Sequence, residues 1–261
     1  MTSHPTFQAG GIRYDEIAPR YSAARSMSAE TADTWARVIG SFIPKSQPAT
    51  VLDLGCGTGR FTTLMAERFA VRVIGVDLSL GMIHRAASDV KQEDVYFSAA
   101  SAECLPLHDS CCDLAWMSQV IHHVVDRQAC ARELRRVVKP DGAVLVRGTF
   151  GDRLDSCPTY FRFFPAARVV ASQVPTIRDV LQTFRAAGFR LAAFHSVPQK
   201  TCNSLRELAD RTRLRADTTL VLLSDAEFER CQSKLERAAA KERTPEPVIE
   251  TVDVLILRPH A

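Results

Sequence analysis

One stretch decides the fold: Val51-Leu52-Asp53-Leu54-Gly55-Cys56-Gly57-Thr58-Gly59-Arg60. Three branched apolar residues interrupted by one carboxylate predict a short buried strand. Three alternating glycines follow, and apolar residues then recur at helical spacing, at Phe61, Leu64, Met65 and Phe69. The glycines therefore form a turn between a strand and a helix. Glycine suits such a turn because it tolerates positive φ and lets a ligand approach the backbone closely.

A carboxylate at the end of the next strand extends this pattern. The run 71–76 predicts a strand that ends at Asp77, where a carboxylate can accept hydrogen bonds from the two hydroxyls of a ribose. The dinucleotide fingerprint G-x-G-x-x-G places its third glycine one residue later than this chain does. We therefore favour a nucleoside cofactor. The alternative is a structural turn in which Asp77 only caps the following helix.

Three motifs resemble the class I S-adenosylmethionine (SAM)-dependent methyltransferases: Asp53-Leu54-Gly55-Cys56-Gly57-Thr58-Gly59, Asp77, and Ala102-Glu103-Cys104-Leu105-Pro106-Leu107. Within that family they look like the small-molecule group that includes the quinone and biotin-pathway methyltransferases. The resemblance covers about residues 12–148. It implies an α/β, Rossmann-like sheet of seven strands, mostly parallel, with helices on both faces and the last strand antiparallel.

Alternating hydrophobic patterns support this fold class. Helices are expected at 28–40, 59–69, 80–88, 126–137, 176–187 and 224–240, and strands at 51–54, 71–76, 95–97, 113–117, 143–146, 189–197 and 252–257. A turn is expected at Lys139-Pro140-Asp141-Gly142. Such alternation implies right-handed crossovers and a parallel sheet covered on both faces.

A chain of 261 residues is long enough for one domain with additions. We divide it into an N-terminal cover (1–45), a SAM-binding core (46–148), an inserted lid (149–175) and the C-terminal half of the sheet with added helices (176–261). The insertion is long for a compact domain, which is typical of a lid or binding segment. Its aromatic cluster predicts an apolar or aromatic substrate; the cluster is Tyr160, Phe161, Phe163 and Phe164. Arg162 or Arg168 in the same segment is expected to meet an acidic group of that substrate. The alternative is a helix packed on the sheet edge.

The resemblance implies a set of cofactor-binding residues at the carboxyl ends of the strands, where open α/β sheets bind ligands. Leu78 and Met82 are expected to enclose the adenine ring. Ser101 stands where many relatives carry an aspartate, so a weaker bond to the adenine amino group is expected there. The alternatives are a loop role for Glu103 and, for Tyr14 and Tyr21, a surface helix whose aromatic side chains only pack on the core. The set is Asp53, Gly55, Cys56, Gly57, Gly59, Asp77, Leu78, Met82, Ser101, Ala102, Glu103, Ser118, Gln119, Tyr14, Tyr21 and Arg25.

His122 and His123 are the candidate catalytic residues, since they follow the fourth strand where a substrate can reach the methyl group. Histidine titrates near neutrality and can accept a proton from the methyl acceptor. Adjacent residues on a helical turn do not share a face, so one at most is expected to point inward. A structural histidine is the alternative. The sulfonium of SAM already makes the methyl carbon electrophilic, so an in-line transfer needs no metal.

Composition narrows the class of protein. A net charge of +3 is too small to predict a nucleic-acid surface. The eight cysteines show no C-x-x-C pair and no zinc-ligand spacing, so a metal site is not expected. The thiols are expected to be reduced. No signal-peptide pattern and no apolar run of about 20 residues is visible. We expect a cytoplasmic protein without a membrane span; its oligomeric state is left open.

The predicted function is SAM-dependent methyl transfer to an O, N or C atom of a small molecule. A non-catalytic SAM-binding or regulatory protein is the first alternative, because neither histidine is established as a base. An NAD-dependent oxidoreductase is disfavoured by the glycine spacing. An RNA or protein methyltransferase is disfavoured because Ser118-Gln119-Val120-Ile121 stands where an Asn/Asp-Pro-Pro-aromatic motif would be expected.

Overall fold

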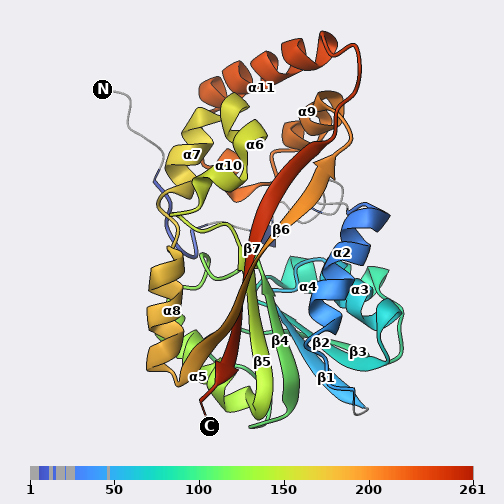
Figure 1. Ribbon diagram of the computed structural model, residues 1–261, viewed down its shortest axis with the longest axis vertical. Coiled ribbons are helices and arrows are strands. Elements are labelled where there is room, and N and C mark those ends of the chain that lie inside the picture. Colours follow the sequence, from blue (N-terminus) through green and yellow to red (C-terminus); the bar gives the residue numbers. More distant parts are fainter. Residues whose placement is uncertain (1–5, 12–13, 16–20, 22–26, 46–47, 261) are drawn as a thin grey trace.

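A seven-stranded sheet with strand order β3-β2-β1-β4-β5-β7-β6 forms the centre of the molecule (Figure 1). The computed structural model describes residues 6–11, 14–15, 21, 27–45 and 48–260. β1 to β5 pair in parallel, and β7 is antiparallel to both of its neighbours. The predicted α/β, Rossmann-like sheet is therefore confirmed. The strands are β1 (Ala49–Leu54), β2 (Val71–Asp77), β3 (Val95–Ala99), β4 (Cys112–Ser118), β5 (Val138–Gly148), β6 (Phe189–Cys202) and β7 (Val248–Pro259).

Three strands, β5, β6 and β7, extend well beyond their predicted ends. The expected turn at 139–142 is a bulge inside β5: Cys112 and Leu114 of β4 pair with Val138 and Ala143. β6 and β7 extend past the sheet because they pair with each other along their whole length, as far as Cys202 and Val248. The edge position of β6 explains why Pro198, which has no N–H to donate, is tolerated within it.

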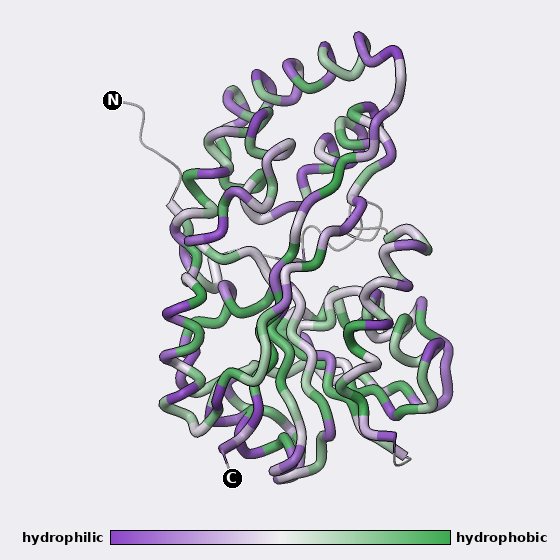
Figure 2. Tube along the Cα trace, viewed as in Figure 1, coloured by the Kyte–Doolittle hydropathy of each residue, from purple (hydrophilic) through white to green (hydrophobic). Residues whose placement is uncertain are grey.

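Helices cover both faces of the sheet, as predicted. α2 (Ala29–Gly40) and α3 (Arg60–Arg68) pack on one face, whereas α5 (Arg127–Val137) and α8 (Ile177–Ala186) pack on the other. α4 (Leu80–Asp89) packs along β2 and β3. In Figure 2 apolar residues follow the central strands, whereas the helices alternate between apolar and hydrophilic positions. The N-cap residues of α2, α4, α5 and α8 each accept a backbone N–H of the first helical turn through their side chains. These residues are Ser28, Ser79, Asp126 and Thr176.

The remaining helices form one group at the carboxyl-terminal end of the sheet, which we call the helical cap (residues 154–171 and 205–240; Figure 1). Its elements are the 3-10 turn η1 (Leu154–Ser156), α6 (Pro158–Phe163), α7 (Pro165–Ala171), α9 (Leu205–Arg213), α10 (Thr218–Val221) and α11 (Asp225–Ala240). They enclose an apolar core of their own, together with Cys202 and Val248 from the outer ends of β6 and β7. The cap is thus built from both 149–175 and the C-terminal half of the chain.

This arrangement corrects the prediction for two of the four residues of the aromatic cluster. Phe163 and Phe164 are buried in the cap core, where Phe164 stacks on Phe228 at 6.2 Å between ring centroids. Neither can meet a substrate as a lid residue. The alternative of a helix on the sheet edge holds in part, because the segment packs on other cap helices and on Cys202 and Val248 at the outer ends of β6 and β7. The predicted arginine that meets an acidic ligand is not found at Arg168, which pairs with Asp155.

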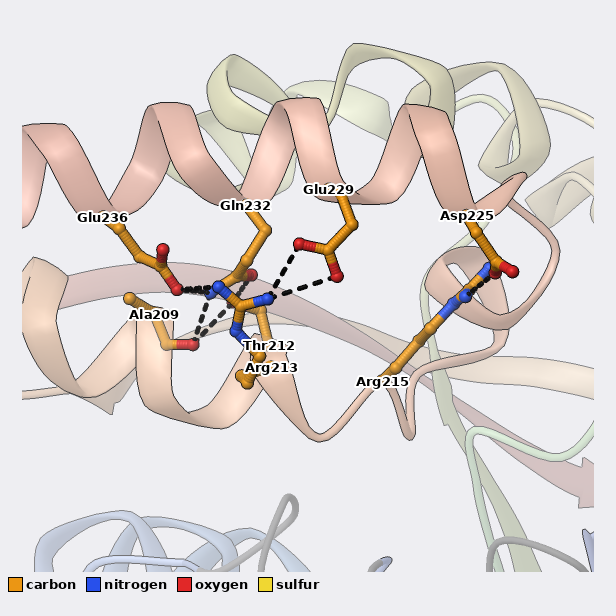
Figure 3. A network of polar contacts seen from close by, with 8 residues as sticks. All are labelled: Ala209, Thr212, Arg213, Arg215, Asp225, Glu229, Gln232 and Glu236. Atoms are coloured by element: carbon orange, nitrogen blue, oxygen red, sulfur yellow. Dashed lines mark hydrogen bonds and ion pairs between the residues drawn. The ribbon is translucent and has the colours of Figure 1, made fainter.

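A polar network holds α9 against α11 (Figure 3). The buried amide of Gln232 accepts a hydrogen bond from Thr212 at 2.8 Å and donates one to the carbonyl of Ala209 at 2.8 Å. Arg213 spans from α9 to Glu229 and Glu236 on α11. Exposed ion pairs contribute little, but a buried amide must be hydrogen-bonded. Gln232 therefore fixes the register of these two helices.

Candidate active site

The glycine turn joins β1 to α3 at the carboxyl end of the sheet. Gly55, Gly57 and Gly59 have φ angles of +71°, +56° and +82°, which residues with side chains rarely adopt. A Cβ on Gly55 would lie 2.2 Å from Cγ2 of Val120. Cys56 is buried between them, and burial raises the pKa of its thiol well above the usual value. The turn is therefore tightly constrained and its thiol is neutral.

Asp77 lies at the end of β2 and fixes the glycine turn. Its Oδ2 accepts a hydrogen bond from the N–H of Gly57 at 2.9 Å, and its Oδ1 accepts one from Ser79 at 2.9 Å. Burial raises the pKa of this carboxyl, and the two backbone N–H groups oppose that shift. The cap of α4 is Ser79, whose side chain accepts from the N–H of Met82. Asp77 is therefore not the residue that caps the next helix.

Asp53 is buried inside β1 beneath the turn. Its Oδ2 accepts a hydrogen bond from Thr62 at 2.6 Å. Burial raises the pKa of Asp53 to about 7, although the Thr62 hydroxyl opposes the shift. In the protein without a bound cofactor, Asp53 thus titrates near neutrality.

Two tyrosines of the N-terminal cover lie over this site. Cε1 of Tyr21 is 3.8 Å from the position of a Cβ on Gly57, and its ring meets that of Tyr14 edge-on at 6.1 Å. Both tyrosines pack on Met82, which is fully buried, whereas Leu78 is 75% exposed at the rim. An adenine ring between Leu78 and Met82 stays a prediction. Arg25 lies outside the described residues.

The loop after β3 carries the next predicted group. The hydroxyl of Ser101 accepts a hydrogen bond from the N–H of Glu103 at 3.1 Å, and Ala102 between them is half-buried. The carboxylate of Glu103 turns toward the start of α5 and accepts from the N–H of Asp126 at 2.8 Å. The structure thus gives Glu103 a loop role; its contact with adenine stays a prediction.

The end of β4 departs from ordinary backbone geometry. Gln119 has a φ of +60°, which is uncommon for a residue with a side chain. Its N–H donates to the carbonyl of Arg147 at 2.8 Å, and its Oε1 accepts from Thr149 at 3.3 Å. Backbone strain of this kind gathers at functional sites. Ser118 and Gln119 both line the cavity described below.

The two histidines differ in surroundings, although their ring centroids are 4.1 Å apart. His122 is buried and lines the cavity. His123 contacts two hydroxyls through Nε2, that of Tyr14 at 2.7 Å and that of Thr218 at 3.2 Å. Of the pair, His122 is the residue that faces the cavity, whereas His123 joins separate parts of the chain.

A cavity of about 220 Å³ lies between the carboxyl ends of the strands and the helical cap. Its apolar wall includes Tyr160, Phe161 and Leu220, and its polar wall includes His122 and Arg147. A second hollow follows the glycine turn and is lined by Asp53, Gly55, Cys56, Gly57 and Thr58. The two hollows share four residues: Tyr21, Met27, Arg60 and Ser118. They are therefore adjoining compartments.

Several cavity residues were not predicted. Arg147 follows the apolar run Ala143-Val144-Leu145-Val146 of β5. A charged residue at the carboxyl end of a buried strand could have been predicted to face the ligand site. Gln199 and Thr218 reach the cavity only through the long β6 and the cap, so no local pattern marks them. Among the described residues, no three His, Cys, Asp or Glu side chains gather closely enough to hold a metal ion.

Residues 52–146 match the model of a methyltransferase domain. This range contains the glycine turn, Asp77 and the end of β4, and the strand order agrees with the expected sheet. The matched residues make up little more than a third of the chain, and over them the chain is similar to methyltransferase domains.

Two curated relatives match over about half of the chain. A malonyl-[acyl-carrier protein] O-methyltransferase of Pseudescherichia vulneris is 34% identical over 137 residues, 52% of this chain and 52% of that protein. A ubiquinone/menaquinone biosynthesis C-methyltransferase of Syntrophotalea carbinolica is 31% identical over 137 residues, 51% of this chain and 58% of that protein. The chain thus spans little more than half the length of these relatives.

The whole fold also has a solved counterpart. The crystal structure of the [4+2]-cyclase SpnF superimposes with a TM-score of 0.68 at 20% identity, over 98% of this chain and 99% of that one. A likeness at this identity shows the fold alone. In the part of the chain that the structure describes, none of the helices has the length and apolar composition needed to cross a bilayer.

Proposed function

We propose that this protein transfers the methyl group of SAM to an O, N or C atom of a small-molecule acceptor. The observation that carries the proposal is the pair of adjoining compartments, one along the glycine turn and one beneath the cap, which share Tyr21, Met27, Arg60 and Ser118. Such a pair can hold a nucleoside cofactor and an acceptor side by side.

The residues at the glycine turn and at the carboxyl end of β2 fit SAM. Each carboxylate oxygen of Asp77 accepts one backbone N–H and can also accept a ribose hydroxyl. Gly57 leaves the space beneath Tyr21 without a side chain. We propose that Asp77 holds the ribose, that Leu78, Met82 and residues 101–103 surround the adenine, and that Ser118 and Gln119 face the methionine part. Tyr14, Tyr21 and Arg25 would cover the cofactor.

The bound sulfonium supplies an electrophilic methyl carbon, so the protein's task is alignment and exclusion of water. Alignment alone can supply roughly 7–11 kcal/mol. We propose that His122 accepts the acceptor's proton where the acceptor is protonated, because His122 lines the cavity. His123 is assigned a positioning role, since its Nε2 meets the hydroxyls of Tyr14 and Thr218.

The cavity supports an acceptor with an apolar or aromatic body. Tyr160 and Phe161 from the cap line one side, together with Ala171, Val174 and Leu220. A cytoplasmic location is also proposed; it is supported by the eight cysteines, all of which are free thiols.

Transfer from SAM carrying a tritiated methyl group into a pool of metabolites tests the proposal. Label should appear in a small molecule, which mass spectrometry then identifies. SAM binding in calorimetry without transfer to any metabolite would indicate a regulatory SAM-binding protein instead. Binding of NAD in place of SAM would indicate the oxidoreductase alternative.

A further inference from the structure

Arg147 places a buried guanidinium in the wall of the cavity. The residue is only 4% exposed and lies at the carboxyl end of β5. Its Nη1 donates to the hydroxyl of Ser118 at 2.9 Å, and its Nη2 donates to Oε1 of Gln199 at 2.9 Å. Ser118 also lines the glycine-turn compartment, so Arg147 lies close to the junction of the two.

The guanidinium is held in one orientation. Its central carbon lies 4.3 Å from the ring centroid of Trp35 and 5.4 Å from that of Phe61. Oε1 of Gln199, which accepts from Arg147, also accepts from Nε1 of Trp35 at 2.8 Å. Trp35 itself is fully buried. A ligand that meets Arg147 therefore finds a planar donor group that is already ordered, so little side-chain entropy is lost on binding.

We propose that Arg147 anchors a carboxylate of the methyl acceptor, so that the substrate is an organic acid with an apolar or aromatic body. This inference rests on the proposed function and names the substrate class of the same site. A guanidinium presents a fork of N–H donors that matches a carboxylate in a planar, bidentate geometry. Shielding from water strengthens such a pair relative to one in solution.

The other charges of the cavity are compatible with this assignment. Lys200 pairs with Glu30 at 2.7 Å, and Arg211 pairs with Glu207 at 2.8 Å. Asp217 accepts hydrogen bonds from the N–H and hydroxyl of Thr219, as the N-cap of α10. Arg60 and Glu250 also line the cavity. A ligand carboxylate is attracted to Arg147 and repelled by the acidic residues, so charge orients the acid as well as binding it.

Calorimetry on the protein saturated with S-adenosylhomocysteine tests the inference, with benzoate, benzamide and phenyl phosphate as probes of similar shape. Benzoate should bind at least about tenfold more tightly than benzamide, as expected for a charge-assisted bidentate contact. Arg147→Met should remove this preference while benzamide affinity changes less than about twofold. Arg147→Lys, which keeps the charge but not the fork, should retain only part of the preference. Arg162→Gln, at an exposed arginine of α6 outside the cavity lining, should leave the preference intact.

Equal binding of benzoate and benzamide to the unaltered protein would overturn the inference without any variant, as would an absence of benzoate binding. Equal weakening of both probes by Arg147→Met would show that Arg147 only supports the wall. Tighter binding of phenyl phosphate than of benzoate would overturn the carboxylate assignment. Failure of the protein to bind S-adenosylhomocysteine at all would instead contradict the proposed function.

Discussion

The phenolic oxygen of Tyr14 lies 2.7 Å from Nε2 of His123, although 109 positions separate the two residues. The hydroxyl of Thr218 on α10 lies 3.0 Å from the same oxygen and 3.2 Å from the same nitrogen. Three polar groups from the N-terminal cover, the loop after β4 and the helical cap thus meet at one point. This meeting point is where we expect the two compartments to be closed from water.

Loss of the Tyr14 hydroxyl should therefore impair the acceptor step. Tyr14→Phe removes the contacts with both His123 and Thr218 and keeps the ring over Tyr21. We expect kcat/KM for the acceptor to fall about three- to tenfold, the usual effect of a lost hydrogen bond. Steady-state kinetics measure this change. Tyr96→Phe, at an exposed tyrosine of β3 that lines neither compartment, is the matched control and should have a smaller effect.

A pH profile separates the two histidines. His122→Asn should remove the acidic limb from the pH dependence of kcat when the acceptor carries a proton, because that limb reports protonation of the cavity-facing base, which the variant lacks. His123→Asn should lower kcat without removing that limb. The assignment of roles is wrong if His123→Asn loses this limb and His122→Asn keeps it.

Backbone geometry at the glycine turn predicts a partial rescue. Gly55→Ala should destabilise the protein because φ is +71° and the new Cβ would lie 2.2 Å from Cγ2 of Val120. The left-handed conformation alone costs about 1–2 kcal/mol for a residue with a Cβ. Val120→Ala added to Gly55→Ala should recover the steric part of the loss but not the backbone part. Urea unfolding measures both; stability of Gly55→Ala equal to that of the parent would contradict the model of the turn.

The buried carboxyl of Asp53 predicts how stability depends on pH. Its pKa rises from 3.8 to about 7 on folding, so the folded state binds the proton more tightly than the unfolded chain does. Its contribution therefore weakens stability progressively as the pH rises from about 4 to about 7. One pKa unit corresponds to about 1.4 kcal/mol, so the loss is at most about 4 kcal/mol. Asp53→Asn, in protein free of cofactor, should flatten this part of the curve; a steeper curve would refute the assignment.

Phe164 distinguishes a cap core from a lid. Phe164→Ala should lower the free energy of unfolding by about 3–5 kcal/mol, as large-to-small changes of buried aromatics do. SAM affinity of the folded fraction should stay within about twofold of the parent. Arg162→Ala in the adjoining helix α6, where the side chain is exposed, should change stability by about 0.5 kcal/mol or less. A rise in acceptor KM without loss of stability in Phe164→Ala would restore the lid interpretation.

The sheet and the glycine turn could be predicted because their signals are local. Strand 51–54, the three glycines and Asp77 lie within 27 residues of chain, and each follows from the geometry of a strand-to-helix turn. Caps such as Ser79 and Thr176 are also local, since each side chain accepts from a backbone N–H three residues ahead.

The cap and much of the cavity could not be predicted because they depend on distant contacts. The local sequence around Phe164 indicates a lid residue, because its contact with Phe228 comes from a distant part of the chain. Gln199 appears as an ordinary polar residue until Trp35 and Arg147 are found to donate to it. Glu103 reaches the N–H of Asp126 across 23 positions. None of these pairings has a sequence period that would indicate it.

Calorimetric titration of SAM into the protein and into Asp77→Ala tests the central claim most directly, with Asp94→Ala, an exposed acid at the opposite end of β3, as the control. SAM should bind to the parent and to the control, and at least about tenfold more weakly to Asp77→Ala, because that variant loses the carboxylate proposed to hold the ribose. Absence of SAM binding to the parent, or equal affinity in Asp77→Ala, would contradict that claim.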